Sequence, residues 1–374
     1  MIDDSAFSNH ASQAGCTHPA AQYNCFCAPA TEPSSSRRGF LSSLGALGAA
    51  AALPGCTTAT TGTNVKNRID THHHVFSPAY VQELAKVNQA PPIVRNWSIA
   101  KTLDDMDKAG VITSIASVTT PQVQFADGPN ARRIAREGNE WAAKLAKDYP
   151  GRFGSFIMLP LQDIDGSLKE IEYGMDVLKA DGVGLLTSYG DKWLGHPSFA
   201  PIMDELNRRK AILYTHPTAA NCCRNILTPD IPPTVVEFGT DTTRTIVDIV
   251  FSGTAARCSN INFIFSHAGG TLPFLTERLL RAPIIDPKLV ARVPNGVLHE
   301  LKRFYYDTAW SAHPGALASL MTLVNVSQVL FGSDYPYRTG EDHVKGIIEY
   351  GFSTADLDAI GRGNAQRLMP QWKV

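Results

Sequence analysis

Eight short apolar runs recur along the chain between residues 69 and 332, and amphipathic segments separate them. The runs are rich in β-branched and aromatic residues, which is typical of buried strands. The segments between them carry apolar residues at three- and four-residue spacing, as at Leu168, Ile171 and Met175, which is typical of helices. We predict strands at residues 69–74, 112–118, 153–159, 183–187, 211–215, 262–266, 304–307 and 328–332. We predict helices at residues 167–180, 199–210, 242–258, 272–281, 315–325 and 356–369.

This alternation of strand and helix restricts the fold class. Eight strands, each followed by a helix, favour an α/β fold of the (β/α)8 TIM-barrel type over an open doubly wound sheet. No Gly-x-Gly-x-x-Gly motif follows any of the strands, which argues against a dinucleotide-binding sheet. We therefore expect one barrel domain over residues 57–374.

The first 56 residues have the features of a targeting segment. Residues 1–35 lack periodicity, and Arg37 and Arg38 precede the weakly apolar, Gly- and Ala-rich run of residues 42–53. Paired arginines ahead of such a run resemble a twin-arginine export signal, which a receptor reads and which does not span the membrane. We expect a tail and signal segment at 1–56, export to the periplasm by the twin-arginine machinery, and a mature domain that begins near residue 57. A cytoplasmic location is the alternative.

Charge and cysteine content exclude some partners. The 34 Lys and Arg residues balance 35 Asp and Glu residues, so the net charge of -1 offers no broad cationic surface for nucleic acid. The seven cysteines form no regular disulfide framework. Cys222 and Cys223 are adjacent, and we expect both to be small, buried packing residues. A supporting position beside the site, or oxidation in the periplasm, is the alternative.

Polar residues collect where the first predicted strand ends, in the sequence Asp-Thr-His-His-His at residues 70–74. Side chains on a strand alternate between its faces, so His72 and His74 share one face and His73 points to the other. Two imidazoles on one face, about 6–7 Å apart along the strand, can bind one divalent metal ion. We expect His73 to be packed or hydrogen-bonded behind the site.

Three further predicted strands end in residues that can bind a metal. His216 and His267 directly follow the strands at 211–215 and 262–266, and Asp334 lies two residues after the strand at 328–332. Active sites of (β/α)8 barrels lie at the carboxyl ends of the strands, so these side chains should meet His72 and His74 at one rim. A lone histidine at a strand end is usually structural, but five such residues in this order favour a metal site.

These motifs resemble the amidohydrolase superfamily. Asp-x-His-x-His at 70–74, His-x-Gly-Gly-x-x-Pro at 267–273 and Gly-Ser-Asp-Tyr-Pro at 332–336 are similar to the branch containing aminocarboxymuconate semialdehyde decarboxylase and the ortho-hydroxybenzoate decarboxylases. Residues 104–111, 181–218 and 241–253 look closest to 6-methylsalicylate decarboxylases. The resemblance implies one divalent metal ion, zinc ahead of manganese, because the strand at 183–187 ends without the lysine of two-metal members.

The resemblance also implies roles for the residues. His72, His74, His216 and Asp334 would bind the metal, and His267 would act as an acid or base beside it. A protonated Asp334 would deliver the proton that replaces carbon dioxide on the ring. The implied substrate is a small aromatic or unsaturated carboxylic acid such as an ortho-hydroxybenzoate, and the implied assembly is a homodimer.

Substrate contacts and reaction class remain open at this point. Arg244, at the start of a predicted helix, is a candidate cation for the substrate carboxylate, with a surface arginine as the alternative. Candidates for stacking on a substrate ring are Trp97, Tyr189, Trp193 and Trp310. A decarboxylase is the first interpretation. A metal-dependent hydrolase of a lactone or amide, a hydratase, and a non-catalytic binding protein are the alternatives.

Overall fold

The computed structural model describes residues 66–223 and 230–373. All of them belong to one compact unit, Thr61–Val374. The expected export signal and the expected domain start near residue 57 lie outside the described residues. Among the helices that the structure describes, none has the length and apolar character needed to cross a membrane.

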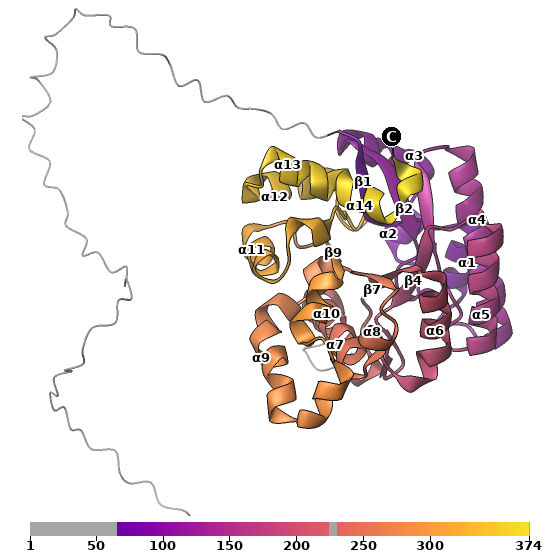
Figure 1. Ribbon diagram of the computed structural model, residues 1–374. Helices are drawn as coiled ribbons and strands as arrows, with labels where there is room; N and C mark the ends of the chain where they lie inside the picture. The colour runs from indigo at the N-terminus through magenta and orange to yellow at the C-terminus, as the bar shows by residue number, and fades with distance from the viewer. Residues whose placement is uncertain (1–65, 224–229, 374) are drawn as a thin grey trace, which may run out of the picture. The chain divides into compact units, whose positions relative to one another are not determined.

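Eight parallel strands form a nearly closed barrel, in the order β1-β2-β3-β4-β7-β8-β9-β10, and Figure 1 shows the helices arranged around them. Each predicted strand is present within a few residues of its expected bounds, so the prediction of a (β/α)8 barrel is confirmed. The strands are β1 (Arg68–His74), β2 (Val111–Ser117), β3 (Phe153–Ile157), β4 (Gly182–Leu186), β7 (Ile212–His216), β8 (Asn262–Phe265), β9 (Tyr305–Asp307) and β10 (Val329–Leu330).

Helices connect consecutive strands and cover the outside of the barrel. The longer ones are α1 (Pro78–Lys86), α3 (Ile99–Lys108), α4 (Gly128–Asp148), α5 (Ile164–Glu172), α6 (Ala200–Arg209), α7 (Glu237–Phe251), α9 (Leu272–Ile285), α10 (Val297–Arg303), α11 (Pro314–Leu323) and α12 (Gly340–Tyr350). The short ones are α2 (Pro92–Arg95), α8 (Thr254–Arg257), α13 (Thr354–Asp358) and α14 (Asn364–Leu368). Side chains at the helix starts accept backbone N–H groups, as Asp127 does from Asn130 at the start of α4.

Tighter and wider helical turns supplement these helices. Two π-helical turns, Tyr173–Val177 and Ala359–Gly363, extend α5 and join α13 to α14. The 3₁₀ turns are Pro197–Phe199, Asn221–Cys223, Pro233–Val235, His267–Gly269, Pro287–Arg292, Val326–Gln328 and Pro370–Trp372. A two-stranded antiparallel hairpin, β5 (Ser188–Tyr189) with β6 (Lys192–Trp193), follows β4. This hairpin was not among the elements predicted from the sequence.

The core has an inner and an outer layer. The barrel interior is filled by side chains from alternating strand positions, including Ile69, Ile115, Phe156, Tyr214 and Ile264. The larger outer layer packs the other faces of the strands against the helices. The interior is therefore a packed core, and it leaves the carboxyl rim of the strands as the place for polar groups.

The segment that follows β10 closes the barrel against β1. The backbone N–H of Thr71 donates to Phe331 O at 2.9 Å, and that of His74 donates to Tyr335 O at 2.8 Å. Between these bonds, the N–H of Asp334 donates to His72 O at 2.8 Å. The last strand's continuation thereby places Asp334 directly beside the two histidines of β1.

Candidate metal centre

The structure brings the five candidate residues together at the carboxyl rim of the barrel. His72 and His74 end β1, His216 ends β7, His267 begins the turn after β8, and Asp334 follows β10. One carboxylate oxygen, Asp334 Oδ1, lies 2.8 Å from Nε2 of His74, 3.1 Å from Nε2 of His72 and 3.9 Å from Nε2 of His216. The other oxygen, Oδ2, lies 3.4 Å from Nε2 of His267. All five side chains are buried or nearly so.

The donor set fits a divalent metal ion. Single ligand atoms of His72, His216, His267 and Asp334 all lie within 4.8 Å of one another. The Nε2 atoms of His72, His74 and His267 and Oδ1 of Asp334 are buried without a hydrogen-bond partner of acceptable geometry. Buried polar atoms are rarely left unsatisfied, and imidazole and carboxylate groups are the ligands of zinc and related ions. A metal ion would satisfy the converging atoms.

The three histidines expected to bind the metal are His72, His74 and His216. In each of them, the ring nitrogen Nδ1 has a hydrogen-bond partner. Nδ1 of His72 lies 2.8 Å from Asp307 Oδ2, and Nδ1 of His216 lies 2.8 Å from the carbonyl oxygen of Pro217. Nδ1 of His74 lies 3.2 Å from the hydroxyl of Ser117. Such contacts orient metal-binding rings, and here they leave the Nε2 atoms directed at the centre.

Asp70 fixes the backbone on both sides of the site. Its Oδ1 accepts from the N–H groups of His72 at 3.0 Å and Ser333 at 3.1 Å, and its Oδ2 accepts from the Ser333 hydroxyl at 2.5 Å. Asp334 has φ +60° and His267 has φ +55°, which non-glycine residues rarely adopt. Backbone held in such conformations is typical of functional sites.

His73 points away from the centre, as its position on the strand predicts. Its Nδ1 lies 3.1 Å from Asp70 Oδ2, and its ring stacks on Tyr335 with 5.0 Å between ring centroids. His313 lies at the start of α11 and caps this helix by accepting from the N–H of Ala316.

Opposite charges dominate the electrostatics of the centre. Burial lowers the pKa of His72, but the carboxylates of Asp307 and Asp334 outweigh burial and raise this pKa to about 10. Burial lowers the pKa of His216 to about 3. Burial raises the pKa of Asp334, yet the surrounding imidazoles hold it well below its ordinary value. In the metal-free protein Asp334 is therefore a carboxylate. The protonated Asp334 of the sequence analysis is not its resting state.

Asp307, at the end of β9, belongs to the site and was not among the sequence candidates. Its Oδ2 contacts His72, and its Oδ1 accepts from the N–H groups of His267 at 2.9 Å and Ala309 at 3.0 Å. The side chain is fully buried. The signal that could have found it is the one used for Asp334, an acidic residue at the carboxyl end of a barrel strand.

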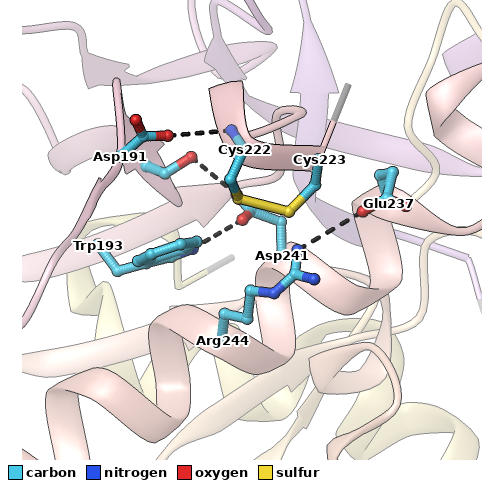
Figure 2. The surroundings of a disulfide bond; sticks show 8 residues. Asp191, Trp193, Cys222, Cys223, Glu237, Asp241 and Arg244 are labelled. Carbon is cyan, nitrogen blue, oxygen red and sulfur yellow. Dashed lines mark hydrogen bonds and ion pairs between the residues drawn. A yellow bond between two sulfur atoms is a disulfide. The ribbon is translucent and has the colours of Figure 1, made fainter. Parts of the chain in front are cut away.

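Arg244 does not start a helix. Helix α7 begins at Glu237, so Arg244 lies in its interior, because the predicted start at residue 242 was five residues late. The guanidinium lies 3.5 Å from a carboxylate oxygen of Glu237 on the same helix and is one third exposed. Figure 2 shows this ion pair, and among the described residues Arg244 makes no hydrogen bond or ion pair with the histidine cluster.

Cys222 and Cys223 are bonded to each other, and the expectation of two buried packing residues was wrong. They form a disulfide in the turn after β7, with Cys222 exposed and Cys223 buried (Figure 2). The N–H of Cys222 donates to Asp191 Oδ1 at 3.0 Å, which attaches this turn to the β5–β6 hairpin. Adjacent cysteines look like ordinary small residues in a hydropathy pattern, so their pairing was not foreseen.

The aromatic candidates have different surroundings. The indole N–H of Trp193 donates to the buried Asp241 at 2.7 Å, and the hydroxyl of Tyr189 donates to Gln122 at 3.2 Å. Trp97 packs in the core. Trp310, which follows β9, is 50% exposed and has the guanidinium of Arg338 5.3 Å from its ring centroid. Of the four, Trp310 is the one with a largely accessible ring.

A barrel with histidine and aspartate ligands at its carboxyl rim defines a class of metal-dependent enzymes, and comparison with known proteins places this chain within it. Residues 69–370 match the family model described as amidohydrolase, and the chain belongs to that family. Its curated relatives include decarboxylase macB of Penicillium terrestre, 35% identical over 329 residues, which cover 82% of this chain and 96% of the relative. They also include 6-methylsalicylic acid decarboxylase of Penicillium expansum, 34% identical over 275 residues, which cover 72% and 85%.

Solved structures share the fold. A dihydroxybenzoic acid decarboxylase from Polaromonas, crystallised with manganese and the inhibitor 2-nitroresorcinol, superposes with a TM-score of 0.71. The match covers 83% of this chain and 98% of that one, at 21% sequence identity. At this identity the likeness establishes the shared barrel fold.

Proposed function

We propose that the protein is a metal-dependent decarboxylase of a small aromatic carboxylic acid, with an ortho-hydroxybenzoate as the model substrate. The observation that carries the proposal is the convergence of His72, His74 and His216 on Asp334 at the barrel rim. The decarboxylase names of relatives that share about a third of their residues with this chain support the reaction class.

The proposed ligands are His72, His74, His216 and Asp334. When bound, a divalent metal ion would hold the substrate's carboxylate and ortho hydroxyl together and withdraw electrons from them. We favour zinc because three imidazoles and a carboxylate are typical zinc ligands. Manganese is the competing ion, since the Polaromonas structure contains it. Metal analysis of protein purified without added metal, followed by reconstitution with each ion, distinguishes the two.

Residues of the chain itself would deliver the proton that replaces carbon dioxide on the substrate ring. Loss of carbon dioxide breaks the bond between ring and carboxylate and leaves an electron pair on the ring carbon, which must take up one proton. Asp334 is the proposed donor to that carbon. Because Asp334 is a carboxylate at rest, it must first be protonated, and His267, with Nε2 at 3.4 Å from Asp334 Oδ2, is placed to supply that proton.

The first test is an assay of the full-length protein, with its metal content measured, over a panel of ortho-hydroxybenzoates and lactones. Carbon dioxide release that depends on about one metal ion per chain is expected. Lactone opening without carbon dioxide release would instead identify a hydrolase of the same family.

Replacement of Asp334 by Asn should abolish turnover, because the amide cannot carry the proton to the ring. Steady-state carbon dioxide release should fall by at least about 100-fold, within the range that general acid catalysis contributes. The control is Asp181→Asn, which alters a partly buried carboxylate hydrogen-bonded to Ser155 and Trp372, outside the proposed centre. Retained turnover in the Asp334→Asn protein would remove Asp334 from the mechanism.

We further propose export by the twin-arginine route and assembly as a homodimer. Export is supported by Arg37 and Arg38 ahead of the apolar run, and dimerisation by the family resemblance alone. Replacement of both arginines by lysine should keep the protein in the cytoplasmic fraction of the producing cell. Light scattering of the purified protein tests the dimer, and a monomeric mass would refute it.

A further inference from the structure

Asp307 makes three hydrogen-bonding contacts that connect two members of the centre. We propose that Asp307 is a positioning residue that fixes the tautomer of His72, so that Nε2 of His72 presents its lone pair to the metal ion. The inference rests on the metal-binding part of the proposed function and is independent of the substrate. In the metal-bound state the His72 ring keeps one proton, and Asp307 would determine which nitrogen carries it.

The contact with His72 leaves one arrangement of protons. Oδ2 of Asp307 lies 2.8 Å from Nδ1 of His72, and both side chains are fully buried. An ionised carboxylate can only accept a hydrogen bond, and the two backbone N–H groups that donate to the other oxygen of Asp307 favour its ionised form. Nδ1 must then be the donor. A neutral imidazole with its proton on Nδ1 has its lone pair on Nε2.

The other oxygen of Asp307, Oδ1, has hydrogen-bond donors of its own. The carboxylate therefore cannot rotate to place Oδ1 beside His72. Oδ1 accepts from two backbone N–H groups, those of His267 at 2.9 Å and Ala309 at 3.0 Å. Backbone N–H groups can only donate, so the atom at this position must be an acceptor. The same carboxylate thereby orients a metal ligand and secures the backbone of the proposed acid or base.

The remaining two ligand rings are controlled differently. Nδ1 of His216 faces the carbonyl of Pro217, which also can only accept. Nδ1 of His74 faces the hydroxyl of Ser117, which can either donate or accept. His72 is thus the ligand whose tautomer depends on an ionisable side chain, and a change at Asp307 can reverse it.

The decisive variant is Asp307→Asn in the full-length protein. Its amide oxygen must occupy the Oδ1 position, since the two N–H groups there need an acceptor. The NH₂ group then faces Nδ1 of His72, which has to accept, and the ring proton moves to Nε2. That proton opposes metal binding. Asp307→Ala leaves Nδ1 without a partner and allows either tautomer.

The measurement is zinc affinity of the metal-free proteins, by competition with a chromophoric chelator and with no substrate present. The expected order of affinity is wild type, then Asp307→Ala, then Asp307→Asn, with Asp307→Asn weaker than wild type by roughly 10- to 100-fold, as for other partners of metal-binding histidines. A purely structural role predicts the reverse order of the variants, because Asn keeps the shape and Ala removes all three contacts.

Two controls complete the experiment. Ser117→Ala removes the partner of His74 Nδ1 and should change zinc affinity by less than about threefold, since that partner does not dictate a tautomer. Asp181→Asn, an acid-to-amide change at a partly buried position elsewhere in the barrel, should bind zinc as the wild type does. If Asp307→Ala fails to fold, as thermal unfolding would show, the comparison of Asp307→Asn with Asp181→Asn decides. Equal affinity in those two proteins would overturn the proposal, and it would do so whether or not the enzyme decarboxylates.

Discussion

Gly346 lies where helix α12 crosses the segment that follows β9. A Cβ atom at this position would overlap the carbonyl oxygen of Ala312 and lie 2.8 Å from its carbonyl carbon. Backbone atoms cannot move aside as the end of a flexible side chain can. We therefore predict that Gly346→Ala lowers the free energy of unfolding by about 2–3 kcal/mol, a typical cost of overpacking, although alanine is the better helix former. Urea denaturation measures this loss.

The matched control is Gly128→Ala in the first turn of α4, where a Cβ would meet no atom within 4 Å. This substitution should leave stability unchanged or raise it by up to about 1 kcal/mol, because alanine restricts the unfolded chain. Equal effects of the two substitutions would show that close approach to Ala312 does not limit the packing of α12.

At the same scale, the sequence predicts that the candidate histidines and Asp334 lie close together, because strand geometry leaves little freedom in where they point. The alternation of side chains places His72 and His74 on one face, and the carboxyl rim gathers the residues that follow other strands. Arg244 was misplaced because its position depends on where a helix begins, which periodicity defines poorly. Asp307 was missed because it contacts a ligand through the ring's far nitrogen, and no motif records such a contact.

At the scale of elements, the start of α12 depends on a carboxylate from α3. Asp105 accepts from the N–H of Gly340, the first residue of α12, at 3.0 Å. Burial raises the pKa of Asp105 to about 6, from an ordinary value of 3.8. The folded state therefore binds its proton more tightly than the unfolded state does. Stability is lost as the pH rises from about 4 through about 6.

Asp105→Asn should remove this pH-dependent loss, because an amide keeps an acceptor for Gly340 and carries no charge. We predict that the variant matches the wild type at pH 4 and exceeds its free energy of unfolding by about 1–2 kcal/mol at pH 7, after allowance for partial solvent screening. Urea denaturation of the metal-free proteins at both pH values measures the difference. A variant equally destabilised at both values would mean that the charge on Asp105 is not the cost.

The elements themselves were predictable to different degrees. The eight barrel strands are easy to predict because each is a buried run of apolar residues bounded by polar ones. The strands β5 and β6 have two residues each, too few for any period to be visible, and Gly190 between them turns at φ +66°. The predicted helix at 167–180 appears as α5 and a π-helical turn, because side-chain spacing does not distinguish the two types of turn.

At the scale of the whole molecule, the centre connects distant parts of the chain. Its side chains come from β1, β7, the turn after β8 and the segment after β10, and the hydrogen-bonded residues Asp70 and Ser333 are 263 positions apart. In the metal-free protein these strand ends carry buried atoms without hydrogen-bond partners. A metal ion that satisfies those atoms also joins the strands to one another. Metal binding should therefore stabilise the barrel as a unit.

We predict that zinc or manganese at 100 times its dissociation constant raises the free energy of unfolding by about 2.7 kcal/mol, the value that linkage gives for a ligand bound only by the folded state. In a domain of this size, that corresponds to an increase of roughly 5 °C or more in the unfolding temperature. Thermal unfolding with metal and with excess chelator measures the shift, and Asp334→Asn should lose most of it. An unchanged unfolding temperature at stoichiometric metal occupancy would mean that the unfolded chain binds the ion as tightly as the folded protein does, so that the assembled centre adds nothing to the affinity.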